Sequence, residues 1–121
     1  MEKKKTLILG ATTNPDRYAY MAAHRLVAAG HDIVNIGIKS GEVAGAEIQP
    51  ASTIFSDIDT ITLYVGPQRQ PEYYDYILAT RPRRIIFNPG TENAELEALA
   101  VQQGIEPVQA CTLVLLSTGQ Y

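Results

Sequence analysis

The fold of this chain is decided by the stretch Lys4-Lys5-Thr6-Leu7-Ile8-Leu9-Gly10-Ala11-Thr12-Thr13-Asn14-Pro15-Asp16-Arg17. Its continuous apolar run, residues 7–9, is typical of a central strand that is covered on both faces of a sheet. The run breaks at Gly10 into a Thr/Asn/Pro turn, and a helical pattern begins at Arg17. The N–H groups and the dipole at a helix N-terminus attract anions. The stretch therefore predicts a phosphate-binding turn at the ligand crevice of an open parallel sheet.

Length and composition favour one compact domain over residues 1–121. A chain of 121 residues with 45% hydrophobic residues can bury roughly two-thirds of its unfolded surface without metal or disulfide support. The formal charge of −3 argues against a general nucleic-acid or membrane binder, which would be basic. One cysteine cannot form an internal disulfide or a zinc cluster. The first apolar run is too short for a signal peptide or a membrane span, so we expect a cytoplasmic protein.

The rest of the chain alternates between strand and helix patterns. The apolar residues between Ala19 and Val27 share one face of a helix. Gly30 is expected to end that helix, because glycine readily adopts the left-handed backbone conformation that follows helix C-termini. Residues 32–36 follow as a second strand, which predicts a right-handed, parallel β-α-β unit. The glycine-rich residues 37–50 predict a loop with a short strand near Glu47-Ile48.

Three further strands and the remaining helices complete the pattern. Strands are predicted at 60–65, 84–87 and 105–108, a helix after Pro71, another helix capped by Thr91 or Asn93, and a last helical turn or packing tail at 113–116. The predicted fold is α/β: a doubly wound, mainly parallel five-stranded sheet, Rossmann-like, in the order 3-2-1-4-5. The ligand crevice is expected over strands 1 and 4.

The first turn departs from the dinucleotide-binding fingerprint G-x-G-x-x-G. Gly10 is its only glycine, and no acid follows the second strand until Glu42, so plain NAD fits poorly. Lys39 occupies that region instead and suits a phosphorylated ribose, as in NADP or in coenzyme A with its 3′-phosphate. Hydroxyls, amides and the Arg17 guanidinium can hold phosphate in a glycine-poor turn. The alternative is that the side chains of residues 12–14 merely cap the helix.

Several short segments at the strand tips occur in a defined order along nearly the whole chain. They are Leu9-Gly10-Ala11-Thr12, Asn14-Pro15-Asp16-Arg17-Tyr18, Ala29-Gly30-His31-Asp32-Ile33-Val34-Asn35, Val65-Gly66-Pro67, Asn88-Pro89-Gly90-Thr91-Glu92-Asn93 and Ala110-Cys111. With these segments the chain resembles the coenzyme A-binding domain family, a small Rossmann-like module also found at the start of the succinyl-CoA synthetase alpha subunit. It is most similar to the stand-alone, single-domain members.

The resemblance implies a coenzyme A (CoA) or acyl-CoA site. It places the ADP moiety on the turn at 10–17, Lys39 near the ribose phosphate, and pantetheine along the tips at 65–67 and 88–90. The implied cofactor-binding residues are Gly10, Ala11, Thr12, Thr13, Asn14, Arg17, Tyr18, Lys39, Val65, Gly66, Pro67, Asn88, Pro89 and Gly90. The synthetase carries its phosphohistidine chemistry in a second domain that this sequence lacks, so its catalytic function does not carry over.

Other polar residues have weaker patterns. His24 is expected at the surface, and His31 is expected to meet solvent or the C-terminus of a helix. Without paired acids or cysteines the two histidines form no metal motif. Cys111 is expected to be a small buried residue, or else to contact a bound thiol. Arg17, at the first turn of a helix, would repel the helix dipole unless a ligand or Asp16 supplies an anion.

The remaining aromatic and basic residues are assigned by their position. Tyr18 is expected to stack on adenine, to cover the crevice or simply to pack at the helix start. The tyrosines at 73, 74 and 76 indicate core, rim or a subunit contact. The arginines at 81, 83 and 84 indicate a solvated patch away from the crevice.

Three functional readings remain open at this point. The favoured reading is a non-catalytic module that binds CoA or acyl-CoA, because no acid/base or nucleophile–base pair can be assembled. The second is an NAD(P)-binding enzyme or redox regulator that uses the same crevice. The third is a ligand-free structural or oligomerisation module. The sequence leaves open a homo-oligomer or a separately encoded partner enzyme, and it predicts neither a nucleic-acid nor a membrane partner.

Overall fold

The computed structural model describes residues 2–121. Within them, seven strands form one sheet in the order β3-β4-β2-β1-β5-β6-β7. The strands are β1 (Thr6–Leu9), β2 (Ile33–Ile36), β3 (Glu42–Val43), β4 (Ala46–Gln49), β5 (Thr60–Leu63), β6 (Arg84–Phe87) and β7 (Glu106–Gln109). The helices are α1 (Tyr18–Ala28), the 3₁₀ helix η1 (Gln70–Tyr73), α2 (Tyr74–Thr80), α3 (Ala94–Gln102) and α4 (Thr112–Ser117).

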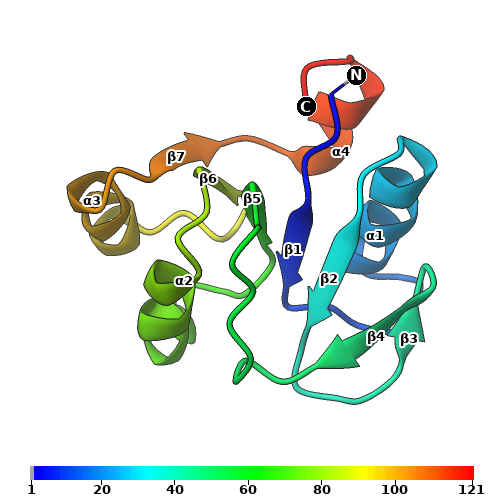
Figure 1. The fold of residues 1–121 in the computed structure, drawn as a ribbon, viewed down its shortest axis with the longest axis horizontal. Helices are drawn as coiled ribbons and strands as arrows, with labels where there is room; N and C mark the ends of the chain where they lie inside the picture. The colour runs from blue at the N-terminus through cyan, green and yellow to red at the C-terminus, as the bar shows by residue number, and fades with distance from the viewer. Residues whose placement is uncertain (1) are drawn as a thin grey trace.

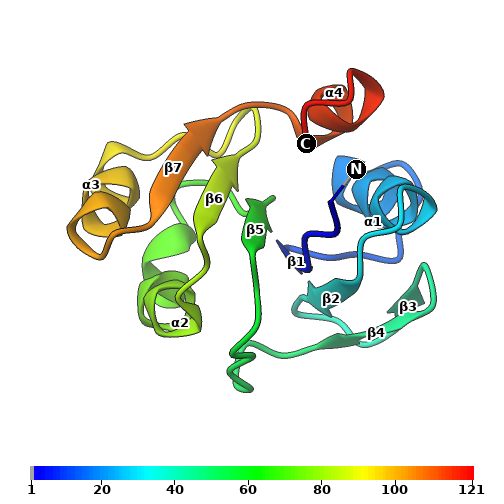
Figure 2. The same cartoon turned by 45° about the horizontal axis from the view of Figure 1, so that its top comes forward.

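Helices cover both faces of the sheet, which confirms the doubly wound α/β class. Figures 1 and 2 show α1 and α4 on one face and α2 and α3 on the other. Side chains alternate between the two faces along a strand. In β1, Leu7 and Leu9 accordingly pack with the α2 and α3 side, whereas Ile8 packs with the α1 and α4 side. Each of these three residues is at most 1% exposed, so β1 is the centre of both cores.

The number and order of the strands correct the prediction. The strand at 60–65 was expected beyond β2, but β5 pairs with β1 in parallel, with Thr6 opposite Thr60 and Leu9 opposite Leu63. The place beside β2 is taken by β4, which pairs with it in parallel. If β4 is counted as the third strand, the sheet has the doubly wound order 3-2-1-4-5-6. The order therefore reverses between β1 and β5, so the crevice lies over these two strands and not over β1 and β6.

The additional strands come from a hairpin within residues 37–50. β3 and β4 are antiparallel, and their turn uses Ala44 and Gly45 at positive φ angles of 53° and 83°. The Asn35 side-chain amide fixes this hairpin from β2, since its Nδ2 donates to the carbonyls of Val43 and Ala46 at 3.0 Å each. The short strand expected near Glu47-Ile48 is confirmed as β4, whereas β3 was not predicted.

Several predicted helix boundaries are confirmed. Gly30 follows α1 with a φ of 92°, in the left-handed region. Asn93, and not Thr91, caps α3 by accepting hydrogen bonds from the N–H groups of Glu95 and Leu96. The helix after Pro71 begins as η1 before it continues as α2. Residues 113–116 are helical, within α4.

Gln70 ties together two loops at the carboxyl edge of the sheet. Its side chain is fully buried, and its Nε2 donates to the carbonyl oxygens of Val65 and Thr91 at 2.8 Å each. Its Oε1 accepts from Asn93 Nδ2 at 2.8 Å. The loops that follow β5 and β6 are therefore held at a fixed separation by one amide whose hydrogen-bonding groups are all used.

His31 does not meet solvent, and Arg84 is not part of a fully solvated patch. His31 is 2% exposed, its Nδ1 accepts from the Lys4 N–H at 2.9 Å, and its ring centroid lies 4.9 Å from that of Tyr121. Arg84 is partly buried and donates to Thr60 Oγ1 at 2.8 Å and to the Tyr121 carbonyl at 3.0 Å. Packing of Tyr121 onto the start of the sheet explains both differences. His24, Arg81 and Arg83 are exposed as expected.

The environment of His31 makes stability depend on pH. Burial, followed by the nearby Lys4 and Arg84 charges, lowers the pKa of His31 below its ordinary value of 6.5. Below that ordinary value the unfolded chain takes up a proton that the native His31 does not. The contribution of the buried, neutral His31 to the free energy of unfolding is therefore complete above about pH 6.5, and it declines as the pH falls below that value.

We expect acidification from about pH 7.5 to about pH 5.5 to lower the free energy of unfolding less in His31→Gln than in the wild type. Urea denaturation at both pH values measures the two differences. The matched control is His24→Gln, because His24 is exposed, and this variant should keep the wild-type pH dependence. Equal pH dependence in His31→Gln and the wild type would contradict the assignment.

A second prediction concerns Gln70. Gln70→Met keeps the side-chain length but removes three hydrogen bonds, so it should destabilise the protein by about 1–3 kcal/mol. Chemical denaturation measures the loss, and amide hydrogen exchange should increase in residues 64–70 and 89–93. Gln68→Met, on an exposed side chain two residues earlier, is the control. Equal stability of Gln70→Met and Gln68→Met would show that Gln70 does not hold the two loops together.

Candidate functional site

A cleft of about 630 Å³ opens at the carboxyl ends of the central strands. Its walls come from four loops: the turn after β1 that leads into α1, the loop after β2, the segment from β5 through η1, and the loop after β6. The volume lies in the range of small-molecule sites. The position is that expected for a ligand crevice, because the strand order reverses at β1 and β5.

The turn after β1 is shaped by its own side chains. Thr12 Oγ1 accepts from the Asn14 N–H at 3.1 Å, and Asn14 Oδ1 accepts from the Asp16 N–H at 3.0 Å. No side chain caps α1. The alternative that residues 12–14 merely cap this helix is therefore wrong.

Gly10 lets the chain after β1 lie very close to the end of β5. Its φ is 100°, and a Cβ at this position would lie 3.0 Å from the carbonyl carbon and oxygen of Tyr64. The N–H groups of Gly10 and Ala11 both donate to the Ile36 carbonyl at 2.9 Å. The turn is thus held against β2 on one side and the end of β5 on the other, and it opens towards the cleft.

Among the described residues 2–121, three cationic side chains and no carboxylate line the cleft. Arg17, Lys39 and Arg69 come from the segments that follow β1, β2 and β5 respectively. The ion pairs found among residues 2–121 are Lys5–Asp57, Arg83–Asp59 and Arg69–Glu72. Arg17 and Lys39 therefore have no carboxylate partner in the described part of the chain, and Asp16 does not neutralise Arg17. The cleft is locally positive in a chain whose net charge is −3.

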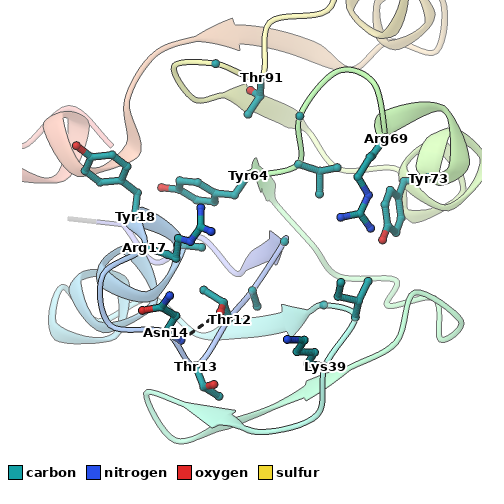
Figure 3. A pocket seen from close by; sticks show the side chains of 18 of the residues that line it. Thr12, Thr13, Asn14, Arg17, Tyr18, Lys39, Tyr64, Arg69, Tyr73 and Thr91 are labelled. Carbon is teal, nitrogen blue, oxygen red and sulfur yellow. Dashed lines mark hydrogen bonds between the residues drawn. The ribbon is translucent and has the colours of Figure 1, made fainter.

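The structure brings most of the predicted site residues together. Those that line the cleft are Gly10, Ala11, Thr12, Thr13, Asn14, Arg17, Tyr18, Lys39, Val65, Gly66, Pro89 and Gly90. Pro67 and Asn88 are not among the lining residues. Figure 3 shows the side chains of Arg17 and Tyr18 on one side of the cleft, with Lys39 on the other.

Asn88 lies beneath the cleft as a buried support. It is 2% exposed, and its Nδ2 donates to Thr62 Oγ1 at 2.8 Å and to the Leu63 carbonyl at 2.9 Å. Its Oδ1 accepts from the Thr112 N–H at 2.9 Å. The side chain thus ties β5, the end of β6 and the start of α4, and its polar atoms are engaged within the protein.

Further lining residues were missed by sequence reasoning. They are Ala19, Gly37, Ile38, Tyr64, Arg69, Tyr73 and Thr91. Tyr64 could have been found, because it directly precedes the strand tip at Val65. Burial raises the pKa of Tyr64 to about 12. Tyr73 was assigned to core, rim or a subunit contact, and no pattern indicated Arg69.

The other titratable side chains do not form a second chemical centre in the described chain. Among residues 2–121, no group of three or more His, Cys, Asp or Glu side chains is placed to hold a metal ion. Cys111 is partly buried and precedes α4, outside the lining of the cleft. Within the same residues, none of the helices has the length and apolarity that crossing a bilayer requires. The arrangement is suited to binding an anionic small molecule.

Comparison with solved structures gives close matches over the whole chain. A crystal structure of an uncharacterized protein is 52% identical, with a TM-score of 0.97 and complete coverage of both chains. A hypothetical protein from Pyrococcus horikoshii OT3 is 26% identical, with a TM-score of 0.84, and the match covers 96% of this chain and 82% of that one. The protein cell-free ID.343 from Thermus thermophilus shares the fold at 20% identity, with a TM-score of 0.87 and coverage of 98% and 91%.

The sequence comparison agrees with the resemblance found at the strand tips. A search of curated proteins finds no match. The profile of the family described as "CoA binding domain" matches residues 4–117 and so includes every segment that lines the cleft. This chain therefore belongs to the CoA-binding domain family.

Proposed function

We propose that this protein binds CoA or an acyl-CoA in the cleft, as a ligand module without chemistry of its own. The observation that carries the proposal is the convergence of Arg17, Lys39 and Arg69 on a cleft that no carboxylate lines. CoA carries a diphosphate and a 3′-phosphate, so its charge complements this arrangement. Membership of the CoA-binding domain family supports the same ligand.

Each end of the ligand has a proposed partner. The diphosphate lies on the turn at residues 10–17, where the uncapped N-terminus of α1 and the Arg17 guanidinium attract anions. Lys39 contacts the phosphorylated ribose. Pantetheine follows the tips at Val65-Gly66 and Pro89-Gly90. The residues proposed to contact the ligand are Gly10, Ala11, Thr12, Thr13, Asn14, Arg17, Tyr18, Lys39, Val65, Gly66, Pro89 and Gly90.

NADP is the second candidate ligand, as part of an enzyme or redox regulator. It is favoured over NAD by one observation: the loop after β2 presents Lys39 to the cleft, and no acidic residue lines it. A carboxylate at this position would hold an unphosphorylated ribose. Because CoA and NADP both carry a phosphorylated ribose, affinity measurements must separate them.

The proposal extends to the biological setting. The chain acts as one ligand-binding domain in the cytoplasm, where it serves a separately encoded partner enzyme or forms a homo-oligomer. A ligand-free structural module is the competing outcome. Binding measurements decide between these readings, since a structural module would have no affinity for any nucleotide.

Titration calorimetry with CoA, dephospho-CoA, NAD and NADP tests the proposed ligand. We expect CoA to bind more tightly than dephospho-CoA, and Lys39→Ala to weaken CoA binding about tenfold, since one charge-assisted contact is lost. Lys3→Ala is the control, because Lys3 is exposed and lies outside the cleft. Binding of NAD or NADP without affinity for CoA would refute the proposal. Absence of binding by all four compounds would favour the structural module.

Arg17 should behave differently from Lys39. Arg17→Gln should weaken CoA and dephospho-CoA equally, by about tenfold or more, because both compounds carry the diphosphate. Arg25→Gln, on the last turn of the same helix and exposed, should leave both affinities unchanged. Loss of affinity for CoA alone in Arg17→Gln would contradict the placement of the diphosphate.

A further inference from the structure

Arg69 is a cation of the cleft that the resemblance did not include among the binding residues. It precedes η1 and lies across the cleft from Arg17 (Figure 3). Tyr73 lies next to Arg69 in this view, and Lys39 lies at a third position around the cleft. The cleft thus has one cation at the start of α1, one after β2 and one after β5.

The segment that presents Arg69 is rigid. Gln70, the next residue, is fully buried and bonded to the carbonyls of Val65 and Thr91. Tyr73, at the end of the same 3₁₀ helix, is partly buried and also lines the cleft. Arg69 and Tyr73 are therefore held in place by an anchored turn, and only the long Arg69 side chain needs to be ordered by a ligand.

The partner that Arg69 has within the protein is easily exchanged. Its Nη2 lies 3.5 Å from Glu72 Oε1, and the two side chains are 53% and 57% exposed. Exposed pairs of this kind contribute little to stability. A phosphate can accept two N–H groups of one guanidinium in parallel and carries more charge than a carboxylate. An arriving phosphate can therefore replace Glu72 as the partner of Arg69.

We propose that Arg69 recognises the 3′-phosphate of CoA together with Lys39, and that Glu72 competes for Arg69 when the cleft is empty. The inference rests on the proposed function and assigns its specificity. The diphosphate is accounted for by Arg17 and the start of α1, so the other two cations of the cleft, Lys39 and Arg69, are left for the second phosphate. The Tyr73 ring beside Arg69 supplies a stacking surface for the base attached to the same ribose.

The selectivity between CoA and dephospho-CoA tests the inference. In Arg69→Gln we expect CoA affinity to fall about tenfold, whereas dephospho-CoA affinity changes by less than about threefold. Arg69→Lys keeps the charge but loses the paired N–H groups, so it should recover only part of the selectivity. Glu72→Gln removes the competing carboxylate and should tighten CoA binding by about twofold to fivefold.

Adenosine 3′,5′-bisphosphate contains only the nucleoside end of the ligand. Its affinities for the Arg69 and Glu72 variants should rank in the same order as those of CoA. Arg25→Gln, which removes an exposed charge outside the cleft, is the control for long-range electrostatics. Arg69 is half-exposed, so thermal unfolding of Arg69→Gln should match the wild type.

One result would overturn the inference while CoA binding itself stands. It is an unchanged ratio of CoA to dephospho-CoA affinity in Arg69→Gln, whether both affinities fall equally or neither changes. If the wild-type protein binds neither compound, the proposed function fails first and the inference fails with it.

Discussion

The convergence of three cationic side chains, Arg17, Lys39 and Arg69, on one cleft is the feature on which the rest of the site depends. Among residues 2–121, only Arg69 of the three has a carboxylate partner. Each cation is carried by a different segment, and those segments are fixed by the sheet beneath them. The cleft is thereby complementary in charge to a ligand that carries phosphate groups.

Buried amide side chains hold these loops at their positions. Asn35 fixes the β3–β4 hairpin next to β2, Gln70 joins the loops after β5 and β6, and Asn88 ties β5 and β6 to α4. A side-chain amide can both donate and accept, so Gln70 and Asn88 each bond carbonyl and N–H groups on separate segments. Asn35 acts through its donor alone, since its Oδ1 has no partner among the described residues. The geometry of the site therefore depends on a few uncharged polar residues that do not themselves line it.

Local sequence patterns predicted those parts of the fold that short-range chemistry decides. The apolar run of β1, Gly30 after α1 and the Asn93 cap of α3 all follow from neighbouring residues. β4 was predicted as a short strand, but its pairing with β3 in a hairpin was not, because the hairpin is fixed by two hydrogen bonds from Asn35 on β2. The burial of His31 and Arg84 depends on Tyr121, which lies at the other end of the described chain from β1.

The residues of the candidate site also divide into those that local sequence patterns predicted and those that depend on distant contacts. The turn at 10–17 and Lys39 were found because strand tips and helix starts have recognisable chemistry, and the structure brings them into one cleft. Arg69 and Tyr73 lie on either side of the buried Gln70, which sets the course of this turn. The direction of the two side chains therefore could not be inferred from their spacing in the sequence. Asn88 was assigned to the ligand, but its polar atoms are engaged with Thr62, Leu63 and Thr112.

Phosphorus NMR of CoA titrated with the protein would show whether one cleft engages both phosphate regions of CoA at once, since the diphosphate and the 3′-phosphate give separate resonances. We expect both sets of resonances to shift or broaden together and to saturate at one equivalent of protein. Unchanged resonances in the presence of excess protein would refute joint binding of the two phosphate regions.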